Sequence, residues 1–239
     1  MNKQKLVRFI NKYYLSGTVN SVILHSKSGK ISTRFISSDK TLLGELGMDK
    51  WPFEDAEVGV YSTDQFLKLL GVLDEDVNVS INKAGEKAIS LKVTDSNSAV
   101  NYMLSDTSII NKPSAMKRIP NFELKIDITP QVMSKFISGK GALSETENFT
   151  VITDGVNTKR VIGYSSVNTN RVTIPVTTSE CSNIDNVSFN ATVFKEVLNA
   201  NKECESATFE VSSEGLSRIT FKVDDYSSTY YLVAVQDVD

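Results

Sequence analysis

Basic side chains accompany four amphipathic stretches of this sequence. Each stretch has apolar residues at i, i+3 and i+4, the spacing of one helix face. Arg8, Lys68 and Lys135 each lie two residues after the first apolar residue of their stretch, off the apolar stripe, whereas the fourth stretch has Glu196 there, preceded by Lys195. Cations without companion aromatic or amide side chains suit phosphate contact and not base reading. The pattern predicts a phosphate-bearing partner, although an ordinary solvated helix surface explains it equally well.

This basic charge stands in an acidic protein. The chain has 239 residues, with 26 Lys and Arg against 29 Asp and Glu and a net charge of −3. That total argues against a basic domain that coats DNA, but it does not exclude positive charge confined to one face. The basic residues on or beside the four stretches are Lys3, Lys5, Arg8, Lys12, Lys68, Lys135, Lys140, Lys195 and Lys202.

Residues that could perform chemistry are sparse. His25 is the sole histidine, and no Ser-His-Asp or Cys-His arrangement can be assembled around it. The acidic run 74–76 reads as a solvated turn, and the phosphate loop GxxxxGK[ST] is absent. Cys181 and Cys204 form no CxxC, which is typical of reduced thiols in a cytosolic protein. We therefore expect no catalytic residue, no metal and no cofactor.

The four stretches must be helices that present these charges. Their first apolar residues are 60, 67 and 61 residues apart, at Leu6, Phe66, Met133 and Phe194. In the third stretch Thr129 and Pro130 form an N-cap and a first helical residue, and Gly139 is a natural end of the helix. Regular helix spacing of this kind indicates a repeated unit.

Short segments between the helices read as strands, because they are rich in Val, Ile, Thr and Tyr and often alternate in polarity. They are NVSI, AISLKV, NYML, FTVI, KRVIGY, RVTIPV, NVSF, ATFEV, RITFKV and TYYLVAV. AISLKV at 88–93 matches RITFKV at 218–223, and RFI at 8–10 matches KFI at 135–137, at offsets of 130 and 127. The chain is therefore predicted to be a duplication in which each half contains two helices and many strands.

The halves define two similar domains. We expect an N-terminal domain at 1–106, an extended linker with two prolines at 107–121 and a C-terminal domain at 122–239. No apolar run reaches the ~18 residues that a membrane span needs, so we expect no membrane association. The first residues lack the apolar stretch and cleavage site of a secretory signal.

Taken together, these features resemble the sliding clamps, the processivity factors of DNA polymerases, and most of all the clamp of T-even type bacteriophages. The resemblance covers nearly the whole chain. It is carried by the duplicated layout of helices and strands, by YSTDQFLKLLGVLDEDVNVSI at 61–81 and by TYYLVAVQ at 229–236.

The resemblance implies an α+β fold with a duplicated DNA-clamp domain, each domain having two helices on antiparallel sheets. Such chains form closed homotrimeric rings around duplex DNA, so the nine basic residues named above would line the hole. The protein would be a non-enzymatic viral protein in the host cell cytoplasm, with the replicative DNA polymerase and the clamp loader as partners. These partners would dock near the linker, where Ile109 and Ile110 are the apolar candidates, although packing of the linker against its domain explains the two residues at least as well. Subunits would join through strand edges, for which 98–104 and 171–176 are candidates.

Two other classes of function remain. A phage structural or assembly protein built from a duplicated β-rich module would share the repeats without binding DNA. An enzyme of unknown type is the third class, and the missing catalytic constellation speaks against it.

Overall fold

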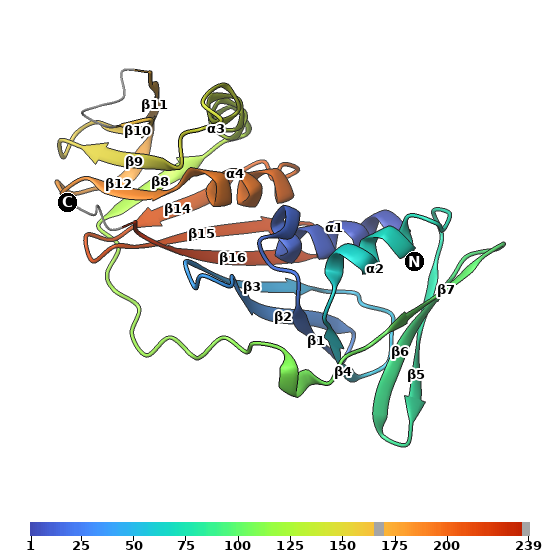
Figure 1. Ribbon diagram of the computed structural model, residues 1–239. Coiled ribbons are helices and arrows are strands. Elements are labelled where there is room, and N and C mark those ends of the chain that lie inside the picture. The colour runs from blue at the N-terminus through green and yellow to red at the C-terminus, as the bar shows by residue number, and fades with distance from the viewer. Residues whose placement is uncertain (165–169, 236–239) are drawn as a thin grey trace. The chain divides into compact units, whose positions relative to one another are not determined.

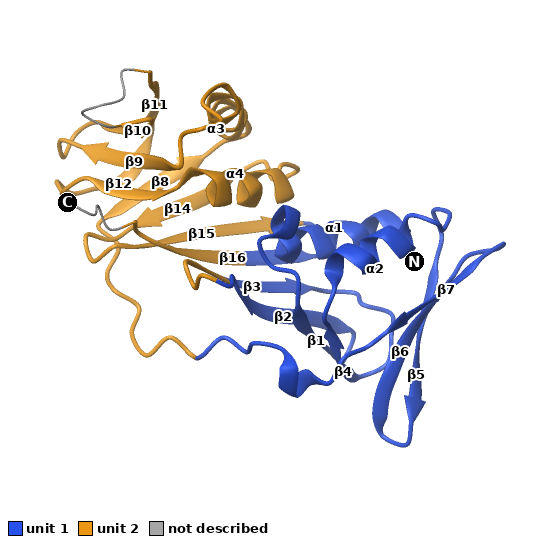
Figure 2. Ribbon diagram, viewed as in Figure 1, with its two compact units in different colours: residues 1–38, 44–114, 224–228 blue, residues 39–43, 115–223, 229–239 orange. Residues whose placement is uncertain are grey.

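A computed structural model describes residues 1–164 and 170–235 of the chain (Figure 1). They form two compact units (Figure 2). Unit 1 comprises residues 1–38, 44–114 and 224–228, and unit 2 comprises residues 39–43, 115–223 and 229–239. The main change of unit, after Ser114, lies inside the predicted linker 107–121.

Unit 1 contains two helices and two antiparallel groups of strands. One group has the order β3-β2-β1-β4 and the other the order β5-β6-β7. The helices are α1 (Lys3–Tyr14) and α2 (Thr63–Leu70), with short 3-10 turns η1 (Leu15–Gly17) and η2 (Thr107–Ile109). The strands are β1 (Val22–Lys27), β2 (Lys30–Ile36), β3 (Leu42–Met48), β4 (Ala56–Val60), β5 (Asn78–Ala84), β6 (Lys87–Thr94) and β7 (Ala99–Met103).

The apolar stripes of the two helices form the core of unit 1. Asn2 caps α1 by accepting a hydrogen bond from the backbone N–H of Gln4 at 2.8 Å. Leu6 of α1 and Phe66 of α2 enclose a small cavity of about 40 Å³ together with apolar residues of β1, β2, β4, β5 and β6. Both strand groups are thus packed against the same helix pair, and the predicted stripe of α1 is buried in full.

Unit 2 repeats this plan. Its strands follow the orders β12-β8-β14-β15-β16 and β11-β10-β9-β13. The helices are α3 (Pro130–Ala142) and α4 (Ala191–Ala200). The strands are β8 (Leu124–Ile128), β9 (Asn148–Thr153), β10 (Thr158–Ile162), β11 (Val172–Val176), β12 (Thr178–Cys181), β13 (Val187–Asn190), β14 (Ala207–Val211), β15 (Leu216–Val223) and β16 (Tyr226–Val233).

Five phenylalanines hold unit 2 together. They come from both helices and from both strand groups, each is fully buried, and their ring centres lie 4.7–6.3 Å apart. Aromatic rings at these distances stabilise a core beyond their buried area. The cluster consists of Phe136, Phe149, Phe189, Phe194 and Phe209.

The predicted α+β class and the duplicated layout are confirmed. Each unit has two helices, and the ten predicted strand segments coincide with β5, β6, β7, β9, β10, β11 and β13 to β16. The matched segments occupy equivalent places, since β6 and β15 are each the second strand after a helix. Among the described residues, no helix is long and apolar enough to cross a membrane.

The predicted end of the third helix at Gly139 is wrong. Thr129 and Pro130 begin α3 as predicted, but the helix continues to Ala142. Gly139 is a packing position, because a Cβ there would lie 3.0 Å from Val172 Cγ1 and 3.2 Å from Ile162 Cδ1. Glycine lets α3 approach β10 and β11 closely despite its low helix propensity.

A buried arginine interrupts the apolar core of unit 2. Arg160 of β10 has no exposed surface, and its guanidinium carbon lies 5.5 Å from the ring centre of Phe136 and 5.4 Å from that of Phe194. Its three side-chain nitrogens have no hydrogen-bond partner in the described part of the chain. Desolvation lowers the pKa of Arg160 to about 9. Two ring faces offset this desolvation only in part.

We therefore expect the substitution Arg160→Met to raise the free energy of unfolding by about 1–4 kcal/mol, because an apolar side chain of similar length removes a buried, unpaired charge. Urea denaturation measures the change. Lys159→Met is the matched control, since Lys159 is exposed on the same strand and its replacement changes stability by less than about 0.5 kcal/mol. A lower denaturation midpoint for R160M would contradict the prediction.

Candidate nucleic-acid interface

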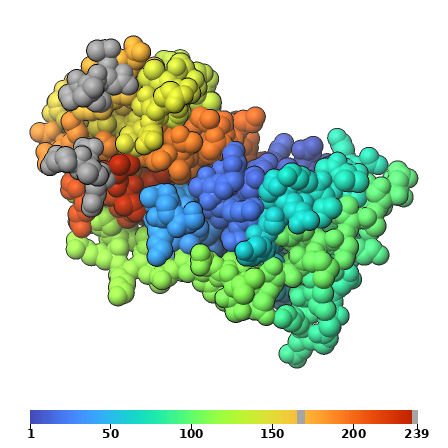
Figure 3. Space-filling model, viewed as in Figure 1, coloured from blue at the N-terminus to red at the C-terminus, as the bar shows by residue number. Residues whose placement is uncertain are grey.

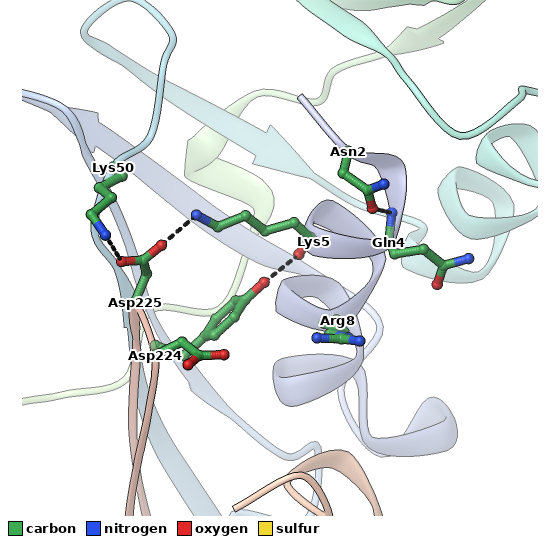
Figure 4. Close-up of a pocket in the computed structure, with 8 residues that line it drawn as sticks. Asn2, Gln4, Lys5, Arg8, Lys50, Asp224 and Asp225 are labelled. Atoms are coloured by element: carbon green, nitrogen blue, oxygen red, sulfur yellow. Dashed lines mark hydrogen bonds and ion pairs between the residues drawn. The ribbon is translucent and has the colours of Figure 1, made fainter.

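The exposed side of α1 presents an arginine beside a solvent-open pocket of about 520 Å³ (Figure 4). Arg8 is exposed and makes no ion pair or hydrogen bond among the described residues. The pocket is lined by three cations and two carboxylates as well as neutral groups, namely Asn2, Gln4, Lys5, Arg8, Lys50, Asp224, Asp225 and Tyr226.

One carboxylate in this pocket holds two lysines. Asp225 Oδ2 accepts a hydrogen bond from Lys5 Nζ at 2.6 Å, and its Oδ1 lies 2.8 Å from Lys50 Nζ (Figure 4). Hydrogen bonds from Lys5 and Lys50 lower the pKa of Asp225, so the carboxylate stays ionised at neutral pH. Tyr226 Oη donates a hydrogen bond to the Lys5 carbonyl oxygen at 2.9 Å, which links the first residue of β16 to α1.

Two other predicted cations of α1 are turned inward. Lys12 is only 1% exposed, and its ammonium lies 5.3 Å from the ring centre of Tyr226. Lys3, the first residue of α1, donates a hydrogen bond to the Leu73 carbonyl oxygen. In unit 1 these two side chains are occupied by the protein itself.

Lys68 of α2 is exposed but paired. Its ammonium lies 2.6 Å from Asp64 Oδ2, one helical turn earlier, and this contact raises the pKa of Lys68. An exposed i, i+4 pair of this kind is weak, so Lys68 can exchange Asp64 for another anion at little cost.

The predicted cations of unit 2 divide in the same way. Lys135 is exposed on α3, and Lys202 is exposed in the turn that follows α4; within the described residues neither makes an ion pair or hydrogen bond. Lys140 is 6% exposed and donates to the Ser144 carbonyl oxygen at 2.7 Å. Lys195 is half-buried and lies 3.1 Å from Glu196 Oε1.

Only some of the predicted basic residues are therefore available to a partner. Arg8, Lys135 and Lys202 present unpaired charge, and Lys68 presents charge that is easily released. Such side chains can hold phosphate groups without reading sequence. Sequence reasoning missed the partners Lys50 and Asp225, for which no local pattern exists, whereas the spacing of Asp64 and Lys68 was a visible signal.

The two linker isoleucines differ in exposure. Ile109 is 61% exposed at the end of η2, whereas Ile110 is 4% exposed. The Cδ1 atom of Ile110 lies 3.0 Å from the place where a Cβ on Gly59 would be, so Ile110 packs the linker onto β4. Figure 3 shows the following linker residues on the molecular surface. Of the two residues, Ile109 is accessible to a partner.

Both predicted edges are terminal strands. β7 ends the group β5-β6-β7 and β11 ends the group β11-β10-β9-β13, within the chain that the structure describes. Pro175 of β11 lies opposite Lys159 and has no N–H, so its nitrogen faces the open side. Thr173, two residues earlier, has the same orientation, and its N–H is therefore directed at the open edge.

Candidate chemistry elsewhere is not assembled into a site. His25 Nδ1 lies 3.4 Å from Glu57 Oε2 on the neighbouring strand, and both side chains are about half exposed. The described residues contain no group of three or more His, Cys, Asp or Glu that could hold a metal ion.

Solved structures share this fold at low sequence identity. The chain is similar to the proliferating cellular nuclear antigen (PCNA) from Entamoeba histolytica, with a TM-score of 0.75 and 12% identity over 99% of this chain and 97% of that one. It is also similar to A. fulgidus PCNA bound to the C-terminal region of FEN-1, with a TM-score of 0.78 and 13% identity over 100% of this chain and 98% of that one. No family model and no curated protein matches the chain. These likenesses confirm the predicted duplicated clamp fold.

Lys135 and Lys140 lie on the same helix, α3, but only Lys135 is exposed, so substitutions of the two lysines compare an accessible cation with a buried one. We expect Lys135→Gln to reduce the slope of log K against log salt for duplex binding by about 0.9, because one phosphate contact is lost. Lys140→Gln on the same helix removes the same charge from a buried position and should leave the slope unchanged. Fluorescence anisotropy with a labelled duplex over a salt series gives both slopes, and equal effects of the two changes would contradict the assignment.

Proposed function

We propose that the chain is a DNA polymerase processivity factor, a ring-shaped sliding clamp that encircles duplex DNA and tethers the replicative polymerase. The observation that carries the proposal is the clamp fold, which extends over the whole chain. The acidic total charge with unpaired cations on the helices agrees with a protein that holds DNA by enclosure and touches it weakly.

In this proposal, the helix pairs face the DNA. Arg8, Lys135 and Lys202 would contact phosphates directly, and Lys68 would do so after leaving Asp64. Lys3, Lys5, Lys12, Lys140 and Lys195 are occupied by contacts within the chain, so we assign them a smaller part.

The open edges supply a way to close a ring. β7 of one copy would pair with β11 of the next, which is a head-to-tail contact and therefore closes when the rotation between subunits is right. Three copies would make the homotrimer of two-domain clamps. The T-even type phage origin and the host cell cytoplasm belong to the proposal through the sequence resemblance alone.

Partner docking is proposed at the linker. A. fulgidus PCNA was solved with the C-terminal region of FEN-1 bound. By analogy, a terminal peptide of the polymerase or of the clamp loader would dock beside Ile109, the exposed apolar residue of the linker. The chain itself would be no enzyme.

A topological assay tests the function directly. The protein is incubated with linear duplex, the DNA ends are then blocked with streptavidin, and the complex is washed at high salt. A clamp stays on the blocked DNA and leaves when a restriction enzyme cuts it, because enclosure does not depend on ion pairs. Binding that the salt wash removes, or that survives the cut, would contradict encirclement.

The edge assignment makes a separate prediction. Thr173→Pro removes an N–H donor directed at the open edge of β11 and leaves the pairing with β10 intact. We therefore expect T173P to lower the oligomer to single chains in light scattering while its circular dichroism stays native. Thr173→Val keeps the N–H and should assemble normally; a wild-type mass for T173P would place the interface elsewhere.

A further inference from the structure

Two of the three cations that line the pocket beside α1 are already paired with a carboxylate. Lys5 and Lys50 come from different elements, α1 and the residues after β3, yet both are held by Asp225 in the turn between β15 and β16 (Figure 4). Each carboxylate oxygen takes one ammonium group. A phosphodiester group also presents two non-bridging oxygens to cations, so Asp225 occupies the place that a phosphate would take.

We propose that Asp225 is an internal competitor for the phosphate groups of duplex DNA, and that it limits the number of phosphate contacts made at α1. This inference rests on the proposed function, because it takes the DNA backbone as the ligand. Asp225 holds two lysines back from the backbone and repels the backbone by its own charge. Arg8, which lines the same pocket without a partner among the described residues, supplies the first contact.

The geometry allows exchange between the two anions. The Lys50 side chain is 79% exposed, so its ammonium can move from Asp225 to a phosphate without breaking a packed contact. The Lys5 side chain is 29% exposed and opens onto the 520 Å³ pocket, which has room for a phosphate group. Both lysines can therefore reach a phosphate, but in the wild type the carboxylate competes for them and keeps these contacts few. A protein that must move along DNA gains from contacts that form and break easily.

Neutralising Asp225 should therefore increase the affinity of the protein for duplex DNA. With Asp225→Asn, two lysines become available, so the slope of log K against log salt should steepen by about 1.8. Correspondingly, the ratio of D225N to wild-type affinity should fall about tenfold between ~50 and ~200 mM salt. The probe is a short labelled duplex in fluorescence anisotropy, which needs neither a polymerase nor a loader.

Glu210→Gln is the matched control. Glu210 Oε2 accepts a hydrogen bond from Arg218 Nε at 2.6 Å, and its Oε1 one from Arg218 Nη2 at 2.8 Å. The neighbouring Phe209 packs against Phe194 of α4, so Glu210 lies on the opposite face of its sheet. E210Q changes the net charge as D225N does and should leave the slope at the wild-type value.

Further variants keep the inference falsifiable. Adding Lys5→Gln and Lys50→Gln to D225N should return the slope to that of the wild type, and Asp225→Ser should reproduce the effect of D225N. An unchanged or shallower slope for D225N, an equal change for E210Q, or no duplex binding by D225N at the lowest salt would overturn the inference. A tighter D225N that still fails the topological assay would support this inference and contradict the clamp function, whereas encirclement with an unchanged D225N slope would do the reverse.

Discussion

Burial of the helix stripes against paired strand groups is the constraint on which the structure depends. In unit 2, Phe136 and Phe194 carry α3 and α4 onto rings that belong to both strand groups. In unit 1, Leu6 of α1 and Phe66 of α2 line one small cavity together with apolar residues of both strand groups. Each helix buries an apolar stripe, so most of its other side faces solvent, although Lys12 of α1 and Lys140 of α3 are buried. The position of every charge on that side then follows from helix geometry.

Electrostatics refines this arrangement by pairing. An acidic chain could present a strongly basic helix face, but acidic residues take up part of its cations, as Asp64 does for Lys68 and Asp225 does for Lys5. The charge that remains unpaired is spread thinly over both units. A surface of this kind attracts a polyanion weakly and without regard to sequence, which is what mobility along the polyanion requires.

The four helices, ten of the sixteen strands in the described residues and the duplication could be predicted from the sequence, because their apolar periods are local, whereas β1 to β4, β8 and β12 were not predicted. Leu6, Phe66, Met133 and Phe194 were sufficient to find all four helices of the described chain. The state of individual cations could not be predicted, because it depends on distant residues. Lys12 lies over Tyr226, and Lys5 pairs with Asp225, 220 residues away. Gly139 misled for a related reason, since its partners on β10 and β11 are tertiary neighbours.

The open edges of β7 and β11 also bear on how the protein must be handled. Unpaired strand edges can form backbone hydrogen bonds with an extended segment of any other chain. Pro175 removes the N–H donor at only one position of β11. If β7 and β11 pair between copies as proposed, chains that are separated by dilution expose both of these edges. In the proposed ring, storage at high concentration would keep both edges covered by like copies, so shelf life should improve with concentration, which is the opposite of the usual rule for aggregating proteins.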